Sequence, residues 1–474
     1  MEPIGIGEAL EATSGELVAG DRGGSICSLS TDTRKLKCGD FFIPLKGNKY
    51  DGHDYLDEAL ARGCSGSMFA RAVSDDDVRG WSARGVALIR VGDTLAALQG
   101  LAQRYRERFR IPLIAITGSN GKTTTKEMVI AIASGRFSVL GSEGSFNNDV
   151  GVPLTLLRLE RNHSLAVLEI GMNARGEIGR LAGLAGPGIG VITNVGPAHL
   201  KFCGTIEEVA ASKAELLGAM SARGGGVAVL NRDDPYVSRM GRGLSLAVKT
   251  FGMGPGADVC GESVRPEPGR VRFSMRFRRA GRPVAVTIPG VGVHNVYNAL
   301  AAAAACEELG IEPGEIAERL GAVRLPPMRM ELVNIKGITV INDAYNANPA
   351  SMRAALETLK GMAVGGKRIL VMGDMLELGA AAEAAHREIG RLAAGCGVDL
   401  LIAVGEQSAL AAEAARGAGM SAGNVVSCPC VREAASVLGE RAGEGDFVLL
   451  KASRRIGLEK ILDEWGFTKE VKQR

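Results

Sequence analysis

Residues 113–128 of this 474-residue chain read LIAITGSNGKTTTKEM. The first five, Leu113–Thr117, are apolar and β-rich, which is typical of a buried parallel strand. A turn containing Gly118 and Gly121 follows, and we expect a helix from about Lys122. Strand, glycine turn and helix in this order predict a phosphate-binding loop, where backbone N–H groups and the helix N-terminus converge on phosphate oxygens.

The residue types in this loop suit a nucleoside triphosphate. Lys122 is placed to neutralise the β- and γ-phosphates, and the Thr123 hydroxyl can reach Mg²⁺. The Walker A pattern has four residues between its glycines, whereas this chain has two. The residues that we expect to surround ATP here are Gly118, Ser119, Asn120, Gly121, Lys122, Thr123 and Thr124.

The segments around the loop alternate between apolar strands and helices. This alternation predicts an α/β fold with a doubly wound, mostly parallel central sheet, and hairpins within residues 246–290. Alternation resumes after Leu325-Pro326-Pro327 as a Rossmann-like α/β block, and a small mixed α/β block precedes the loop. At roughly 150 residues per domain, we expect three domains, at 1–108, 109–323 and 324–474.

Composition excludes several classes of protein. Lys and Arg total 56 against 53 Asp and Glu, with no basic block, so we expect no nucleic-acid partner. No apolar run is long enough for a membrane span, and the acidic start does not look like a secretory signal. The nine cysteines form no CxxC pair, which favours reduced thiols in a cytoplasmic protein. We also expect the protein to be a monomer.

Three further side chains are candidates for metal chemistry. Glu169 ends the strand predicted near 166–170, where ligands of open parallel sheets bind. His199 follows a Gly-Pro turn, and Lys213 lies on a predicted amphipathic helix. From the residues alone, a solvated Glu169, a hydrogen-bonded loop His199 and a solvated Lys213 stay open as alternatives.

Polar side chains also gather in two later segments. Asn295 and Asn298 lie three residues apart on one helix face and could bind a purine edge, although Asn295 could instead cap the helix. The run NDAYNANP at 342–349 is denser in polar side chains than a turn requires. Arg329 and Lys451 are candidate cations for a phosphate group.

These motifs, in this order, resemble the Mur ligases, the ATP-dependent amide-forming enzymes of bacterial cell-wall precursor synthesis. The resemblance spans nearly the whole chain and rests on TGSNGKTTTKEM, LEIGMNARGEI, ITNVGPAHL, SKAEL, GVHNVYNALAAAA, PMRMEL, NDAYNANPASM and GDMLELG. Residues 31–47 and 147–153, with DAYNANP and GDMLELG, are similar to members that add D-alanyl-D-alanine to UDP-N-acetylmuramoyl-tripeptide. The Asp-Asn-Pro-Arg run of members that add diaminopimelate or lysine is absent from the sequence.

The resemblance implies a set of catalytic and metal-binding residues. Lys122 would grip the β- and γ-phosphates, and Thr123 would ligate one of two Mg²⁺ ions with Glu169 nearby. His199 would ligate the second ion. Lys213 matches a family lysine that CO₂ converts to a carbamate, an anion able to bind metal. The residues expected to be catalytic are therefore Lys122, Glu169, His199 and Lys213.

It also implies where the nucleotide and the substrates bind. The expected nucleotide contacts beyond the loop are His294, Asn295 and Asn298 at adenine, Arg329 at the γ-phosphate and Asp343 at the ribose. The expected contacts of the uridine diphosphate are Ser30, Thr31, Asp32, Arg34, Lys46 and Gly47. Asn147 and Asn148 would touch the muramoyl group, and Tyr345, Asn346 and Lys451 would complete the substrate site.

The implied reaction proceeds through an acyl phosphate and requires the third domain to close over ATP. Two positions depart from the family pattern: Ser145 stands where Asn is frequent, and Ala452 where Gly is usual, so the loop at Ala452 must keep a negative φ. The alternatives are a Mur-type ligase that adds a single amino acid, a folylpolyglutamate-synthase-like ligase, a non-catalytic scaffold and a regulatory GTPase. The GTPase would need an Asn-Lys-x-Asp run, which the sequence lacks.

Overall fold

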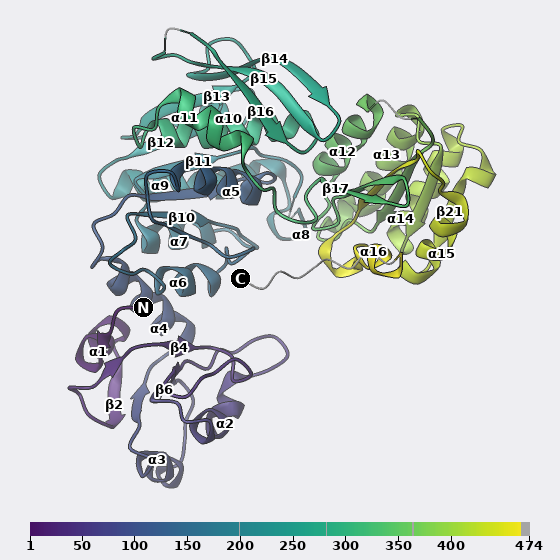
Figure 1. The fold of residues 1–474 in the computed structure, drawn as a ribbon. Helices are drawn as coiled ribbons and strands as arrows, with labels where there is room; N and C mark the ends of the chain where they lie inside the picture. Colours follow the sequence, from purple (N-terminus) through teal and green to yellow (C-terminus); the bar gives the residue numbers. More distant parts are fainter. Residues whose placement is uncertain (199, 281, 363–364, 466–474) are drawn as a thin grey trace. The chain divides into compact units, whose positions relative to one another are not determined.

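The computed structural model describes residues 1–198, 200–280, 282–362 and 365–465 (Figure 1). The predicted α/β class is confirmed, since the strands form one two-stranded sheet and sheets of five, nine and six strands. The chain divides into two compact units: Met1–Ala115, Phe137–Met172 and Gly179–Gly188 form unit 1, and the remainder forms unit 2. Because this border runs through strand β8, the three predicted domain ranges stay a prediction.

Unit 1 contains the five-stranded sheet, in the order β2-β7-β6-β5-β4. Its strands are β2 (Glu16–Ala19), β4 (Leu29–Ser30), β5 (Phe41–Phe42), β6 (Gly66–Phe69) and β7 (Ala87–Arg90), and β1 (Ile4–Gly5) pairs with β3 (Ser25–Ile26). The helices before residue 113 are α1 (Ile6–Thr13), α2 (Leu56–Ala61), α3 (Asp75–Ser82) and α4 (Thr94–Arg106). All pairs in this sheet are parallel except β2 with β7. The segment DFFIPL forms a strand only at β5, because Pro44 has no N–H to continue the ladder.

The nine-stranded sheet has the order β16-β15-β14-β13-β12-β11-β8-β10-β9. Its strands are β8 (Leu113–Thr117), β9 (Val139–Gly141), β10 (Leu165–Glu169), β11 (Ile189–Ile192), β12 (Val227–Asn231), β13 (Ala247–Gly252), β14 (Val259–Glu267), β15 (Arg270–Phe277) and β16 (Val284–Pro289). The hairpin prediction holds for β14–β16, which pair antiparallel, but β13 joins its neighbours in parallel. β8 is buried along its whole length, as its apolar sequence predicts.

Helices surround this sheet, and the longest buried one is rich in alanine. They are α5 (Lys122–Ala133), α6 (Gly151–Leu156), α7 (Glu177–Ala185), α8 (Leu200–Cys203), α9 (Ile206–Ala222), α10 (Val293–Glu307) and α11 (Pro313–Gly321). Figure 1 shows α10 and α11 lying against β14–β16. Small side chains let α10 approach the sheet closely, and each residue from Asn298 to Cys306 is buried.

The six-stranded sheet has the order β17-β18-β22-β19-β20-β21. Its strands are β17 (Glu331–Ile335), β18 (Ile338–Asn342), β19 (Arg368–Gly373), β20 (Leu400–Val404), β21 (Val425–Cys428) and β22 (Phe447–Lys451). Its helices are α12 (Pro349–Gly361), α13 (Ala382–Gly395), α14 (Glu406–Gly417), α15 (Val431–Arg441) and α16 (Lys460–Glu464). Only β17 is antiparallel to its neighbour. The ends of β18, β22 and β19 therefore meet at one edge, and each end carries one of the polar motifs.

Two further properties concern the helices and the cysteines. None of the helices in the described residues combines the length and the hydropathy of a membrane-spanning segment. All nine cysteines are free thiols, as the absence of paired motifs predicts.

A buried lysine ties α10 to β13. Lys249 is 6% exposed, and its ammonium forms ion pairs with Glu307 and with Glu308, the latter at 2.6 Å. Both carboxylates lie at the C-terminal end of α10, where the helix dipole disfavours negative charge. The lysine therefore offsets an otherwise unfavourable cluster of charge.

We expect Lys249→Ala to lower the free energy of unfolding by about 3 kcal/mol, because it leaves Glu307 without its cation and Glu308 with only the exposed Arg279, 3.8 Å away. Arg276→Ala is the matched control, since Arg276 pairs with Glu262 at a site where both side chains are more than 40% exposed. It should cost less than about 1 kcal/mol. Urea unfolding measures both values, and equal losses would contradict the assignment.

Candidate functional site

The phosphate loop joins β8 to α5, and two of its positions have no room for a side chain. Gly118 has φ +144° and Gly121 has φ +82°. A Cβ on Gly118 would lie 1.9 Å from the Thr193 hydroxyl, and one on Gly121 would lie 2.2 Å from Asn298 Oδ1. Both the backbone angles and the close neighbours therefore require glycine.

The end of β11 holds this loop in place. Asn120 N–H donates to Asn194 Oδ1 at 2.9 Å, and the Asn120 carbonyl accepts from Asn194 Nδ2 at 3.1 Å and from the Thr193 hydroxyl at 2.6 Å. Gly196 N–H donates to Ser119 Oγ at 2.9 Å. The segment after β11 thus holds the phosphate loop in place. The sequence prediction missed the brace, although Thr193 and Asn194 lie in the quoted motif ITNVGPAHL.

Two side chains at the end of the loop, Lys122 and Thr123, form hydrogen bonds with protein groups. Lys122 Nζ donates to the carbonyl of Gly118 at 2.9 Å. The Thr123 hydroxyl, 4% exposed, accepts a hydrogen bond from the Arg329 guanidinium at 2.8 Å. The predicted γ-phosphate arginine therefore contacts the phosphate loop.

The two amides of α10 are buried and hydrogen-bonded within the protein. Asn295 Nδ2 donates to the Val291 carbonyl at 2.9 Å, and Asn298 Nδ2 donates to Asn295 Oδ1 at 3.1 Å. Asn298 Oδ1 accepts from the Thr125 hydroxyl at 3.4 Å, beneath Gly121. Asn295 does not cap the helix, because the N-cap is Gly292. The adenine contacts of Asn295 and Asn298 stay a prediction.

His294 lies at the start of the same helix. Charged side chains at the edge of the six-stranded sheet, Asp343 and Lys451, act on it electrostatically. Burial lowers the pKa of His294, the charge of Asp343 raises it, and the charge of Lys451 lowers it further. The predicted adenine and ribose contacts are therefore neighbours in unit 2.

At the edge of the six-stranded sheet, the motifs after β18 and β22 meet in an ion pair. Lys451, 2% exposed, places its ammonium 2.5 Å from Asp343 Oδ2 and donates to the Asn346 carbonyl at 3.1 Å. The guanidinium carbon of Arg329 lies 4.1 Å from the centre of the Tyr345 ring. The structure thus brings together all five of these predicted residues.

Backbone strain surrounds Arg329. Its neighbours Met328 and Met330 have φ +58° and +55°, a region that costs a non-glycine residue about 1 kcal/mol or more. Asp343 Oδ1 accepts from Met330 N–H at 3.2 Å, and Glu331 Oε2 accepts from Met328 N–H at 2.9 Å. These two carboxylates hold the strained turn that carries Arg329.

Two of the candidate metal-binding side chains, Glu169 and Lys213, are buried, which excludes their solvated alternatives. Glu169 is 2% exposed, and in unit 1 its carboxylate accepts from Asn147 Nδ2 at 2.7 Å. In unit 2, Lys213 is 1% exposed on α9, and its charge lowers the pKa of Cys203, which burial raises. His199 lies outside the described residues. Within the ranges that the structure describes, no three His, Cys, Asp or Glu side chains form a metal-binding group.

In unit 1, the predicted uridine diphosphate residues follow two adjacent parallel strands, β4 and β5. Arg34 forms two hydrogen bonds to Asp32, at 2.8 and 2.9 Å, and this guanidinium lowers the pKa of Asp32. Ser30 Oγ accepts from Asp32 N–H at 3.2 Å, so Thr31 lies in a closed turn. Lys46 and Gly47 begin a second turn, in which Gly47 N–H donates to the Tyr50 carbonyl at 2.9 Å.

Of the two muramoyl candidates, Asn148 has a local role as well. Its Oδ1 accepts from Gly151 N–H at 2.8 Å at the start of α6.

The structure also describes the two positions that depart from the family pattern. At the first, the Ser145 carbonyl accepts from Asn147 N–H at 2.7 Å. At the second, Ala452 is buried and is not among the residues with positive φ, as its side chain requires.

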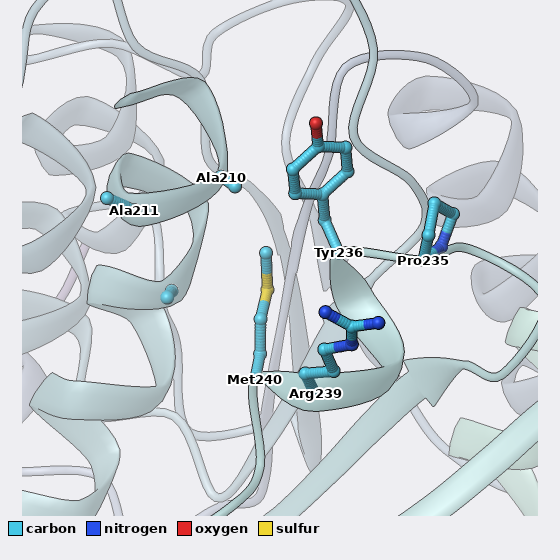
Figure 2. Close-up of a pocket in the computed structure, with 7 residues that line it drawn as sticks. Ala210, Ala211, Pro235, Tyr236, Arg239 and Met240 are labelled. Carbon is cyan, nitrogen blue, oxygen red and sulfur yellow. The ribbon is translucent and has the colours of Figure 1, made fainter. Parts of the chain in front are cut away.

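A cavity of about 540 Å³ lies apart from these motifs (Figure 2). Tyr236, Arg239 and Met240 face helix α9 across it, and none of the predicted site residues lines it. Its other lining residues are Ala210, Ala211, Ala214 and Pro235. The candidate site is therefore defined by the phosphate loop and the strand ends, and not by this cavity.

The GDMLELG motif follows β19 at the same sheet edge and is held by a buried histidine. His386 is fully buried, its Nε2 accepts from Met375 N–H at 2.9 Å, and its Nδ1 lies 2.7 Å from the Ala382 carbonyl. Since Met375 N–H is a donor, the ring must be neutral with its proton on Nδ1. Burial lowers the pKa of His386.

Comparison with known families and proteins gives matches over nearly the whole chain. Residues 116–306 match the Mur ligase middle domain, and residues 328–454 match the Mur ligase, glutamate ligase domain. The UDP-N-acetylmuramoyl-tripeptide–D-alanyl-D-alanine ligase of Bacillus subtilis is 37% identical over 440 residues, which is 93% of each chain.

Solved structures with the same fold include two MurF proteins. The crystal structure of MurF from Acinetobacter baumannii has a TM-score of 0.88 and 30% identity, covering 98% of this chain and 99% of its own. MurF ligase from Thermotoga maritima in complex with ADP has a TM-score of 0.81 and 26% identity, covering 92% and 96%.

The histidine beneath the GDMLELG loop predicts a loss of stability in acid. Because the pKa of folded His386 lies below its ordinary value of 6.5, the unfolded chain takes up the proton first as the pH falls. The melting temperature should drop between pH 7 and pH 5, and His386→Gln should show a smaller drop from a lower starting value. His163→Gln, in unit 1, is the control and should keep the full drop. An unchanged drop in His386→Gln would contradict the assignment.

Proposed function

The chain belongs to the Mur ligase family, and on that premise we propose that it is the ATP-dependent ligase that joins D-alanyl-D-alanine to UDP-N-acetylmuramoyl-tripeptide. The product would be a UDP-muramoyl-pentapeptide, a precursor of peptidoglycan. The observation that carries the proposal is a phosphate loop with two required glycines, in contact with Arg329 and with the polar edge of the six-stranded sheet. The length and identity of the matches to ligases that bear this name support the choice of substrates.

The proposed reaction needs no nucleophile from the protein. The terminal carboxylate of the tripeptide attacks the γ-phosphorus of ATP, the bond to the bridging oxygen breaks, and ADP leaves. The amine of the dipeptide then attacks the acyl carbon, an amide bond forms, and phosphate leaves with one carboxylate oxygen. The amine loses a proton to solvent or to a basic group.

The residues of unit 2 would bind and orient the nucleotide. Backbone N–H groups of the loop and the N-terminus of α5 would receive the phosphates, with Lys122 neutralising their charge. The contact of Arg329 with Thr123 supports its assignment to the γ-phosphate. The proximity of Asp343 to His294 supports a ribose contact beside the adenine site.

The donor set suits Mg²⁺, which prefers oxygen ligands. We propose Thr123, Glu169, His199 and a carbamylated Lys213 as the ligands of two Mg²⁺ ions, as the family resemblance implies. Bound Mg²⁺ would neutralise charge on the transferring phosphoryl group. A neutral Lys213 amine would add to CO₂ and release a proton to become a carbamate.

We assign residues 1–108 to the UDP-substrate, 109–323 to ATP and 324–474 to the acceptor. The paired turns after β4 and β5 support the first assignment, because both follow the carboxyl ends of parallel strands. Tyr345, Asn346 and Lys451 support the third. The free cysteines support a reducing compartment, the cytoplasm, and we expect a monomer.

Phosphate release from ATP tests the proposed function. Release should require both UDP-N-acetylmuramoyl-tripeptide and D-alanyl-D-alanine, and Lys122→Ala should abolish it in a folded protein. Release with D-Ala, L-Ala, D-Glu, lysine or diaminopimelate in place of the dipeptide would indicate a Mur-type ligase that adds a single amino acid. No release with any muramoyl acceptor would overturn the proposal.

Lys213→Ala should lose most of its activity, because the carbamate would no longer form. Short carboxylic acids such as acetate should restore part of it by placing a carboxylate where the carbamate would lie. The rescue is measured as phosphate release at increasing acetate, with Lys122→Ala as a variant that acetate cannot restore. A folded Lys213→Ala protein that acetate does not rescue would contradict the carbamate assignment.

A further inference from the structure

A single amide–amide hydrogen bond joins the phosphate loop to the segment that carries the acceptor residues. Asn348 Nδ2 donates to Asn120 Oδ1 at 2.8 Å, although the two residues are 228 positions apart in the chain. Both belong to unit 2, and Asn348 is 5% exposed. Burial of Asn348 therefore partly shields the contact from competing water.

The orientation of the Asn348 amide is fixed because the same side chain caps helix α12. Asn348 is the N-cap of α12, and its Oδ1 accepts from Ser351 N–H at 2.9 Å. Its own N–H donates to Ser351 Oγ at 3.0 Å, which completes a capping box. Because the cap uses the oxygen, the NH₂ group is the end left to face Asn120.

The partner amide is equally well placed. The backbone N–H and carbonyl of Asn120 are both bound by Asn194, so the loop fixes where its side chain begins. Gly196 also lies next to α12, since a Cβ placed there would be in ordinary contact with Ala350 Cβ, at 3.5 Å. The first turn of α12 thus lies against the braced phosphate loop.

We propose that Asn348 is a positioning residue that sets the acceptor segment at a fixed distance from the transferring phosphate. Tyr345 and Asn346 lie three and two residues before Asn348, in the short connection between β18 and α12. Anchoring Asn348 to the loop therefore anchors the proposed acceptor pocket. The gain is in orientation of the attacking amine, to which reaction rates are strongly sensitive. This inference rests on the proposed function.

Asn348→Ser tests the contact without removing the helix cap. Serine is also a strong N-cap, but its hydroxyl is too short to reach Asn120. We expect kcat for ligation to fall about tenfold, which corresponds to about 1.4 kcal/mol. The KM for ATP should stay within about twofold of wild type, and the melting temperature should be nearly unchanged. Ser351→Ala is the matched control, since it weakens the cap and leaves the contact with Asn120, so its kcat should resemble wild type.

Hydroxylamine separates positioning of the acceptor from formation of the acyl phosphate. This small nucleophile traps an acyl phosphate as a hydroxamate without needing the acceptor pocket, so Asn348→Ser should form hydroxamate at the wild-type rate. The inference is overturned if Asn348→Ser keeps its kcat, if Ser351→Ala loses as much, or if hydroxamate formation falls in parallel with ligation. Wild-type protein that forms no amide with the dipeptide would instead overturn the proposed function.

Discussion

The arrangement of unit 2 depends on a turn of four residues in which two positions must be glycine. Gly118 and Gly121 lie so close to Thr193 and Asn298 that any side chain would collide with them. This close approach brings the segment after β11 onto the loop, where Asn194 braces it through hydrogen bonds, and it brings Asn298 of α10 against Thr125 just after the loop. A loop held in this way presents its N–H groups to an anion without first being ordered, which lowers the cost of binding.

The six-stranded sheet supplies further charged and polar side chains to the phosphate loop. Three adjacent parallel strands, β18, β22 and β19, end at one edge and place Asp343, Lys451 and the GDMLELG segment together. Arg329 and Asn348 extend from this side to Thr123 and Asn120 of the loop. Cations and amides from two sheets thus converge on one phosphate-binding turn. That convergence suits a reaction in which the activated group and its attacker arrive from different sides and water must be kept away.

Local sequence predicted most of the strands, because buried parallel strands are short apolar runs such as Leu113–Thr117 that few other structures tolerate. It also predicted which polar segments meet, since strand ends share an edge. Asn295 and Asn298 share a helix face as expected, and both amides are buried there, bonded to each other and to Val291. The amphipathic pattern around Lys213 suggested solvent, yet the residue is buried. The braces Thr193, Asn194 and Asn348 depend on contacts between distant segments, which periodicity does not encode.

The central claim is that the phosphate loop and its partners direct a carboxylate onto the γ-phosphorus of ATP. The most direct measurement uses UDP-N-acetylmuramoyl-tripeptide labelled with ¹⁸O in its terminal carboxylate, together with ATP and D-alanyl-D-alanine. Mass spectrometry of the released phosphate should then find one ¹⁸O atom in each phosphate, because the acyl phosphate oxygen leaves with it. Released phosphate that instead takes its new oxygen from water, while the amide still forms, would contradict the account.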